Sequence, residues 1–168
     1  PTVPGACGCR VVGGWNPPAT ASPLQACLHQ LFVQQVDRTP QSAAVASGKE
    51  QLTYRQLNQR ANQLAHFLQA QSIGPGTLVG VCLEPSMHMV IALLGILKAG
   101  GTYLPLDPTY PEKRLAFMIA DARPALVLTR QALRLRLLDF SGPLVCLAEA
   151  EKRLLTRPHT DLVLHNIT

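Results

Sequence analysis

Apolar residues in the first half of the chain recur at the three-to-four spacing of amphipathic helices. Ser22-Pro23 supplies a favoured N-cap and a first-turn proline, which predicts a helix over 23–36 with one face packed. Thr53 precedes a longer pattern, which predicts a second helix that Gly74-Pro75-Gly76 ends. The apolar positions of this second helix step by three and four: Tyr54, Leu57, Ala61, Leu64 and Leu68.

Short apolar runs predict strands between and after these helices. Ala43–Ala46 followed by Ser47-Gly48 predicts a strand and a turn, and Leu52 belongs to a second short strand. Leu78–Leu83 is unbroken, as in a strand covered on both faces. Three further strands are expected, at Thr102–Leu106, Ala125–Thr129 and Leu144–Leu147.

Helical patterns separate these strands. Ser86 caps a helix to about Ala99 that is apolar nearly all round and is therefore expected to be buried. Three more helices are expected, one from Pro111, one over 131–138 and one over 148–155. Repeated strand–helix–strand units imply right-handed crossovers. The expected fold class is α/β, a mostly parallel doubly wound sheet flanked by helices.

Composition agrees with an ordered domain or part of one. The chain has 168 residues, of which 47% are apolar and 15% charged. Residues 1–21 are rich in Pro and Gly and are interpreted as an interdomain linker, with the ordered domain over 22–168. The longest apolar stretch, Met87–Leu97, falls short of the roughly 20 residues that cross a bilayer, so no membrane span is expected. The N-terminus lacks a secretory signal and an initiator Met, so we expect a piece of a longer protein.

Charge and cysteine content exclude two function classes. The net charge of +5 is spread thinly, and aromatic residues make up 5%, so nucleic-acid binding is not expected. Arg130, Arg134 and Arg136 are interpreted as one solvated helix face. Cys7-Gly8-Cys9 is too short for a zinc knuckle. The five scattered cysteines therefore indicate reduced thiols in a cytosolic protein: Cys7, Cys9, Cys27, Cys82 and Cys146.

Candidate chemistry at the carboxyl ends of the strands is sparse. No dinucleotide fingerprint, P-loop or nucleophile elbow occurs. Gly100-Gly101-Thr102 is either a ligand loop or a helix C-cap, and its place after a helix favours the cap. Lys98 either contacts an anion or complements the helix dipole, and we favour the dipole.

The other titratable residues have structural interpretations. Asp107-Pro108 fits turn chemistry, Glu112 the first turn of a helix, and Asp121 a helix end. The histidines lack ligand spacing and are read as surface or core residues: His29, His66, His88, His159 and His165. We therefore assign no catalytic, cofactor-binding or metal-binding residue.

Two segments nevertheless carry a specific resemblance. Leu52–Ala65 resembles the first core motif of the adenylation domains of nonribosomal peptide synthetases, and Leu97–Pro108 resembles the second. Gln56 stands where the first motif usually has Glu, and Thr102-Tyr103-Leu104 replaces the commoner Ala-Tyr-Val. The sequence flanking the two motifs also resembles that of these adenylation domains, at Trp15-Asn16, Leu28–Phe32, Gln35-Val36, Arg38–Pro40, Tyr110-Pro111, Arg114-Leu115 and Met118.

The resemblance implies that the parent protein activates an amino acid with Mg-ATP and passes the aminoacyl group to the phosphopantetheine thiol of a carrier domain. Condensation and carrier domains are the implied partners, and the cytoplasm is the implied location. The phosphate loop of the family is expected to follow Thr168, so 22–168 is read as the truncated N-terminal portion of such a domain. On this reading the chain alone forms no adenylate. Two alternatives stay open, a fragment of an acyl-CoA synthetase or aryl acid ligase, and a non-catalytic α/β interaction module.

Overall fold

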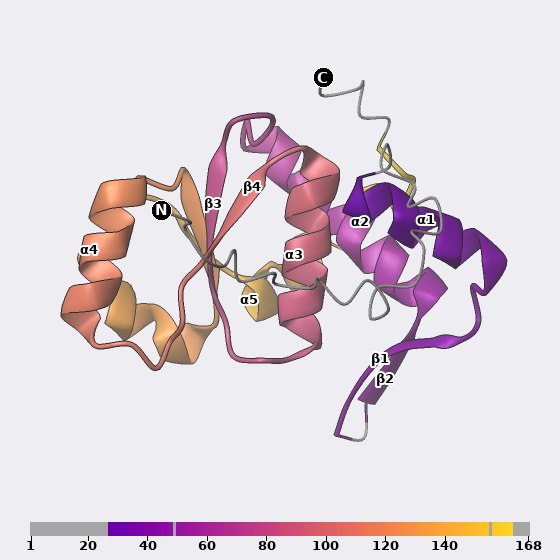
Figure 1. Ribbon diagram of the computed structural model, residues 1–168, viewed down its shortest axis with the longest axis horizontal. Helices are drawn as coiled ribbons and strands as arrows, with labels where there is room; N and C mark the ends of the chain where they lie inside the picture. Colours follow the sequence, from indigo (N-terminus) through magenta and orange to yellow (C-terminus); the bar gives the residue numbers. More distant parts are fainter. Residues whose placement is uncertain (1–26, 49, 155, 163–168) are drawn as a thin grey trace, which may run out of the picture.

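The computed structural model describes residues 27–48, 50–154 and 156–162, which form a parallel sheet with helices on both faces and a separate hairpin (Figure 1). The helices are α1 (Leu28–Arg38), α2 (Tyr54–Ala70), α3 (Met87–Ala99), α4 (Glu112–Ala122), the 3-10 helix η1 (Gln131–Leu137) and α5 (Leu147–Leu154). The strands are β1 (Ala43–Ser47), β2 (Glu50–Thr53), β3 (Leu78–Cys82), β4 (Thr102–Pro105), β5 (Leu126–Thr129) and β6 (Leu144–Cys146). The predicted α/β class is confirmed.

The sheet has the strand order β4-β3-β5-β6, and all its pairs are parallel. The chain runs from β3 through α3 to β4 and then returns through α4 to β5, on the other side of β3. The strand order therefore reverses between β3 and β5. Such a switch point, at the carboxyl ends of the strands, is where open α/β sheets bind ligands. The hairpin of β1 and β2 is antiparallel and lies apart from this sheet.

The two faces of the sheet belong to two hydrophobic clusters. Val79 and Val81 of β3 cluster with residues of α2, α3 and α5. Cys82 and Val127 lie in the second cluster, with residues of α4 and η1. Because successive residues of a strand point to opposite faces, this division confirms that β3 is covered on both sides.

The predicted caps explain where the central helices begin and end. Thr53 Oγ1 accepts a hydrogen bond from Gln56 N, and Gln56 Oε1 accepts one from Thr53 N. Ser86 Oγ accepts from Met89 N. Gly100 has φ of +87°, the left-handed conformation that glycine adopts without strain, and it ends α3 as expected.

Two boundaries and one helix type differ from the sequence-based prediction. Cys27 is extended, and its N–H donates to Gln30 Oε1, so α1 begins at Leu28. The predicted N-cap and first-turn proline, Ser22-Pro23, lie outside the described residues. The second helix, α2, ends at Ala70, because Ser72 adopts a left-handed φ of +62° before the glycines are reached. The segment expected to be helical over 131–138 is a 3-10 helix.

The remaining predictions fall partly outside the described residues. The linker over 1–21, Cys7, Cys9 and His165 lie there. Within the described part, no helix combines the length and apolar character that crossing a bilayer requires.

Candidate functional site

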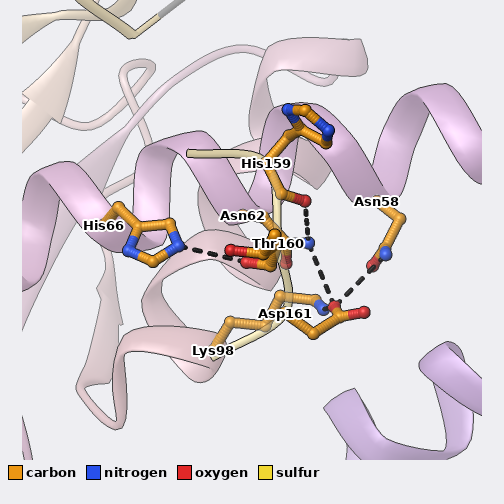
Figure 2. Close-up of polar contacts among 7 residues, drawn as sticks. All are labelled: Asn58, Asn62, His66, Lys98, His159, Thr160 and Asp161. Atoms are coloured by element: carbon orange, nitrogen blue, oxygen red, sulfur yellow. Dashed lines mark hydrogen bonds and ion pairs between the residues drawn. The ribbon is translucent and has the colours of Figure 1, made fainter. Parts of the chain in front are cut away.

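Side chains from two helices converge on residues 159–161, beside the face where α2 packs against α3 (Figure 2). Asn58, Asn62 and His66 come from α2, and Lys98 comes from the last turn of α3. Residues four apart lie on one side of a helix, so α2 presents its three polar side chains together. We call these four side chains and residues 159–161 the polar cluster.

Lys98 and Asp161 form the charged centre of the polar cluster. Lys98 Nζ lies 2.7 Å from Asp161 Oδ1. The Lys98 side chain is 4% exposed and that of Asp161 is 49% exposed, so the cation is buried while the anion reaches water. A buried ammonium needs a counter-ion and hydrogen bonds to offset its desolvation. Asp161 supplies both.

Amide donors from α2 complete the coordination of the same carboxylate oxygen. Asn62 Nδ2 lies 3.0 Å and Asn58 Nδ2 lies 3.2 Å from Asp161 Oδ1. Asn62 Nδ2 also donates to His159 O at 2.8 Å. The two asparagine Oδ1 atoms are buried and have no hydrogen-bond partner within the described chain. Both amides therefore serve as donors here.

His66 adds a contact to the backbone of the same segment. Its Nε2 lies 3.1 Å from Thr160 O. Because a carbonyl oxygen only accepts, the proton of this contact belongs on Nε2.

Electrostatics follow this geometry. Burial alone would raise the pKa of Asp161, but the hydrogen bond and charge of Lys98, with the hydrogen bonds of Asn62 and Asn58, hold it below its ordinary value. Burial lowers the pKa of His29 on α1, and the charge of Lys98 lowers it further. The polar cluster thus favours a negative Asp161, while burial, with the charge of Lys98, favours a neutral His29.

A groove of about 600 Å³ lies at the carboxyl ends of β3 and β4. Two of its polar side chains, Asp107 and Arg114, have partners within the groove. Asp107 Oδ1 accepts from Thr109 N at 2.8 Å and from Thr109 Oγ1 at 2.7 Å, and these two bonds hold the pKa of Asp107 below its usual range. The Arg114 guanidinium lies over the Tyr110 ring, 4.1 Å from its centroid. The groove is lined by Val81, Leu83, Glu84, Pro85, Met89, Pro105, Leu106, Asp107, Pro108, Thr109, Tyr110, Arg114 and Met118.

The switch point between β3 and β5 is bridged by an exposed ion pair. Arg130 Nη1 lies 3.0 Å from Glu84 Oε2, and the two side chains are 46% and 58% exposed. An exposed pair of this kind contributes about 0–1 kcal/mol. The Glu84–Arg130 pair therefore links the ends of β3 and β5 with little effect on stability.

The structure separates the interpretations of the candidate residues. Lys98 contacts an anion, Asp161, so the preferred dipole interpretation was incomplete. Asp107 makes the expected turn, and Glu112 lies in the first turn of α4. Arg136 is half-buried and donates to Tyr110 O at 2.9 Å, so the three arginines do not form one solvated face.

The glycine pair fits the structural interpretation. A Cβ atom on Gly101 would lie 3.0 Å from Ile73 Cγ2 and 3.3 Å from Ile96 Cγ2, so the backbone there approaches core side chains.

The described histidines, cysteines and acidic residues contain no group of three that could hold a metal ion. Burial raises the pKa of the Cys82 and Cys146 thiols, as expected for structural cysteines.

Sequence reasoning missed Asn58, Asn62 and Asp161. A weak signal was present, because two asparagines four residues apart interrupt the side of α2 next to its apolar positions. Asn58 and Asn62 are 8% and 0% exposed, and buried amides need partners. The partner could not be read from the pattern, since Asp161 lies about 100 residues away.

Comparison with known proteins decides the family. Residues 32–164 match the family model described as AMP-binding enzyme. The chain belongs to the AMP-binding enzyme family. A linear gramicidin synthase polypeptide of Brevibacillus parabrevis is 42% identical over 160 residues, which are 94% of this chain and 2% of that protein. The chain thus spans a small part of its relatives' length.

Two solved structures share the fold of this chain. The AMPPNP-bound form of the nonribosomal peptide synthetase FmoA3 has a TM-score of 0.77 and 33% identity, over 88% of this chain and 16% of that one. A fatty acyl CoA synthetase of Mycobacterium tuberculosis has a TM-score of 0.73 at 18% identity, over 82% of this chain and 30% of that one, which shows the fold alone. The similarity to peptide synthetases therefore rests on sequence as well as fold.

The glycine pair of the described chain does not form a phosphate cradle. The Gly100-Gly101 turn caps α3 and packs on Ile73, and a phosphate cradle needs a helix N-terminus after the loop. The Gly100-Gly101 turn therefore does not fit a nucleotide phosphate, and no step of a reaction is assigned to it.

Proposed function

We propose that this chain is the N-terminal portion of an adenylation domain of a nonribosomal peptide synthetase. The observation that carries the proposal is the 42% identity to a linear gramicidin synthase over 94% of the chain. The likeness to FmoA3 at 33% identity supports the same assignment. In this proposal the described residues are the scaffold on which later sequence builds the site.

The complete domain would activate an amino acid. The amino-acid carboxylate attacks the α-phosphorus of ATP, the bond to the β-phosphate oxygen breaks, and the products are aminoacyl adenylate and pyrophosphate. The thiol of a carrier-domain phosphopantetheine then takes the aminoacyl group and AMP leaves. Magnesium, a carrier domain and a condensation domain belong to this proposal. Its place is the cytoplasm, where free thiols such as Cys82 and Cys146 stay reduced.

The test is amino-acid-dependent exchange of pyrophosphate into ATP by the full-length protein that carries this sequence. We expect exchange with at least one amino acid and none by the 168-residue chain alone. Adenylation of fatty or aryl acids in place of amino acids would favour the acyl-CoA synthetase or aryl acid ligase alternative. Absence of exchange with every acid would favour the non-catalytic module.

A further inference from the structure

The polar cluster fixes one atom from three directions. Asp161 Oδ1 receives Lys98 Nζ from α3 and the amides of Asn58 and Asn62 from α2. All three donors lie on the packed helices α2 and α3, and the acceptor lies in the segment that follows α5. Three donors on two packed helices define the position of that oxygen in space, which a single contact would not do.

Neighbouring contacts extend this anchoring along the segment. His159 O accepts from Asn62, and Thr160 O contacts His66 Nε2, so three consecutive residues are held (Figure 2). Leu162 packs against the hydrophobic cluster of α2 and α3. The segment is therefore attached to the helices by side-chain contacts over its last four described residues.

We infer that Lys98 is a positioning residue, which, through Asp161, sets the place and direction in which the chain leaves the α2–α3 face after Leu162. The anchoring is a property of this chain. Its consequence for catalysis rests on the proposed function.

The consequence follows from how little of an AMP-binding enzyme this chain spans. It covers 16% of the AMPPNP-bound FmoA3 chain, and its Gly100-Gly101 turn is a helix C-cap and not a phosphate cradle. The sequence after Leu162 would then have to carry groups that meet ATP. A shift of about 1 Å in such groups can reduce a rate by about a hundredfold, even when its cause lies far from the chemistry.

Cleavage by endoproteinase Asp-N, which cuts before aspartate, measures the anchoring directly. The protein is the full-length polypeptide, and mass spectrometry follows the cut between Thr160 and Asp161. Cutting before Asp121, inside α4, reports unfolding of the rest. Because proteolysis tracks the open population, Lys98→Met should speed the Thr160–Asp161 cut about tenfold or more.

Matched variants separate positioning from general damage. Lys98→Arg keeps the charge, so the protease should cut this variant between Thr160 and Asp161 at close to the wild-type rate. Lys113→Met removes an exposed lysine of α4 and should change nothing. Asn58→Ala leaves the ion pair in place and should speed the cut by a smaller factor, which keeps the test informative should Lys98→Met unfold and cut at Asp121 too. Wild-type cutting rates in both Lys98→Met and Asn58→Ala would overturn the inference.

Pyrophosphate exchange then measures the catalytic consequence. Lys98→Met should lower kcat about tenfold or more while leaving the KM of the amino acid nearly unchanged, because the groups that follow Leu162 would be displaced but still present. Lys98→Arg should restore kcat. An unchanged kcat with a faster Thr160–Asp161 cut would overturn the positioning role. A wild type without any exchange would instead defeat the proposed function, and the cutting rates would still decide the anchoring.

Discussion

Gly95 of α3 faces Leu64 of α2 so closely that a Cβ atom on Gly95 would lie 2.8 Å from Leu64 Cδ2 and 2.9 Å from Leu64 Cγ. Leu64 is fully buried, and its Cγ atom cannot swing away as the end of a long side chain would. The contact between α2 and α3 therefore depends on a missing side chain. This contact also sets the distance between the helices that hold Asp161.

Gly95→Ala should lower the free energy of unfolding by about 1–2 kcal/mol, because the clash outweighs the gain in helix propensity of about 1 kcal/mol. Denaturant titration of the chain measures the difference. Gly74→Ala is the matched control, since its Cβ would meet nothing within 4 Å. Equal midpoints for the Gly95 variant and wild type would show that α2 and α3 have room to separate.

Acid should weaken the polar cluster through Asp161. The pKa of this carboxyl is lowered in the folded chain, so its stabilisation is complete above the unfolded pKa of about 3.9 and is lost as pH falls through the folded value. The stability advantage of wild type over Asp161→Asn should therefore be constant near neutrality and shrink below about pH 4. Unfolding titrations between neutral and acid pH measure it. An advantage independent of pH would contradict the assigned charge.

Glu84→Gln provides the comparison for that experiment. It breaks an ion pair of similar length, 3.0 Å, whose side chains are about half exposed. We expect Glu84→Gln to lower the free energy of unfolding by less than about 1 kcal/mol, and by less still at high salt. If Glu84→Gln lowered the free energy of unfolding as much as Asp161→Asn does, the burial of Lys98 would not make its ion pair the stronger of the two.

The N-terminus of α2 should depend on Gln56 as well as on Thr53. The two residues exchange hydrogen bonds of 3.0 Å and 3.3 Å between side chain and backbone. Thr53→Ala should lower the free energy of unfolding by about 1 kcal/mol, and Gln56→Leu should lower it somewhat less. Gln56→Glu should preserve stability, since a carboxylate accepts the same bond and complements the helix dipole. Thermal melts compare the three variants, and a destabilised Gln56→Glu would contradict the capping role.

Exposed apolar side chains on α4, on η1 and at Leu138, which follows η1, should make the 168-residue chain associate. Phe117, Leu135 and Leu138 are 70%, 73% and 75% exposed. Strands β4 and β6 also end the sheet with unpaired edges among the described residues. Sedimentation should show association at concentrations of tens of micromolar, reduced when the three residues are replaced by Gln. A monomeric, cooperatively melting wild type would contradict this prediction.

The sequence predicted what depends on neighbours in the chain. Thr53 and Ser86 begin helices because their side chains reach N–H groups three residues away, and Gly100 ends one because its own φ is positive. The end of α2 was mispredicted because Ser72 takes a left-handed conformation, which serine seldom adopts and the sequence therefore does not indicate. Each of these outcomes is local.

The polar cluster could not be predicted for the opposite reason. The pattern of α3 shows Lys98 in a last turn, which is enough for the dipole interpretation. Its buried state depends on Asp161, which lies 63 residues further on, and no periodicity connects the two. Pairing between distant residues is information that the tertiary fold adds.

The long separation also orders events during synthesis. Lys98 and Asp161 are 63 residues apart, so at about 5–20 residues per second the ribosome needs roughly 3–13 s to make one after the other. During that interval Lys98 lacks the carboxylate with which it pairs in the folded chain. The ion pair forms only once the strands between have been made and the segment with Asp161 has followed. Formation of this pair thus depends on one of the last described residues to be synthesised.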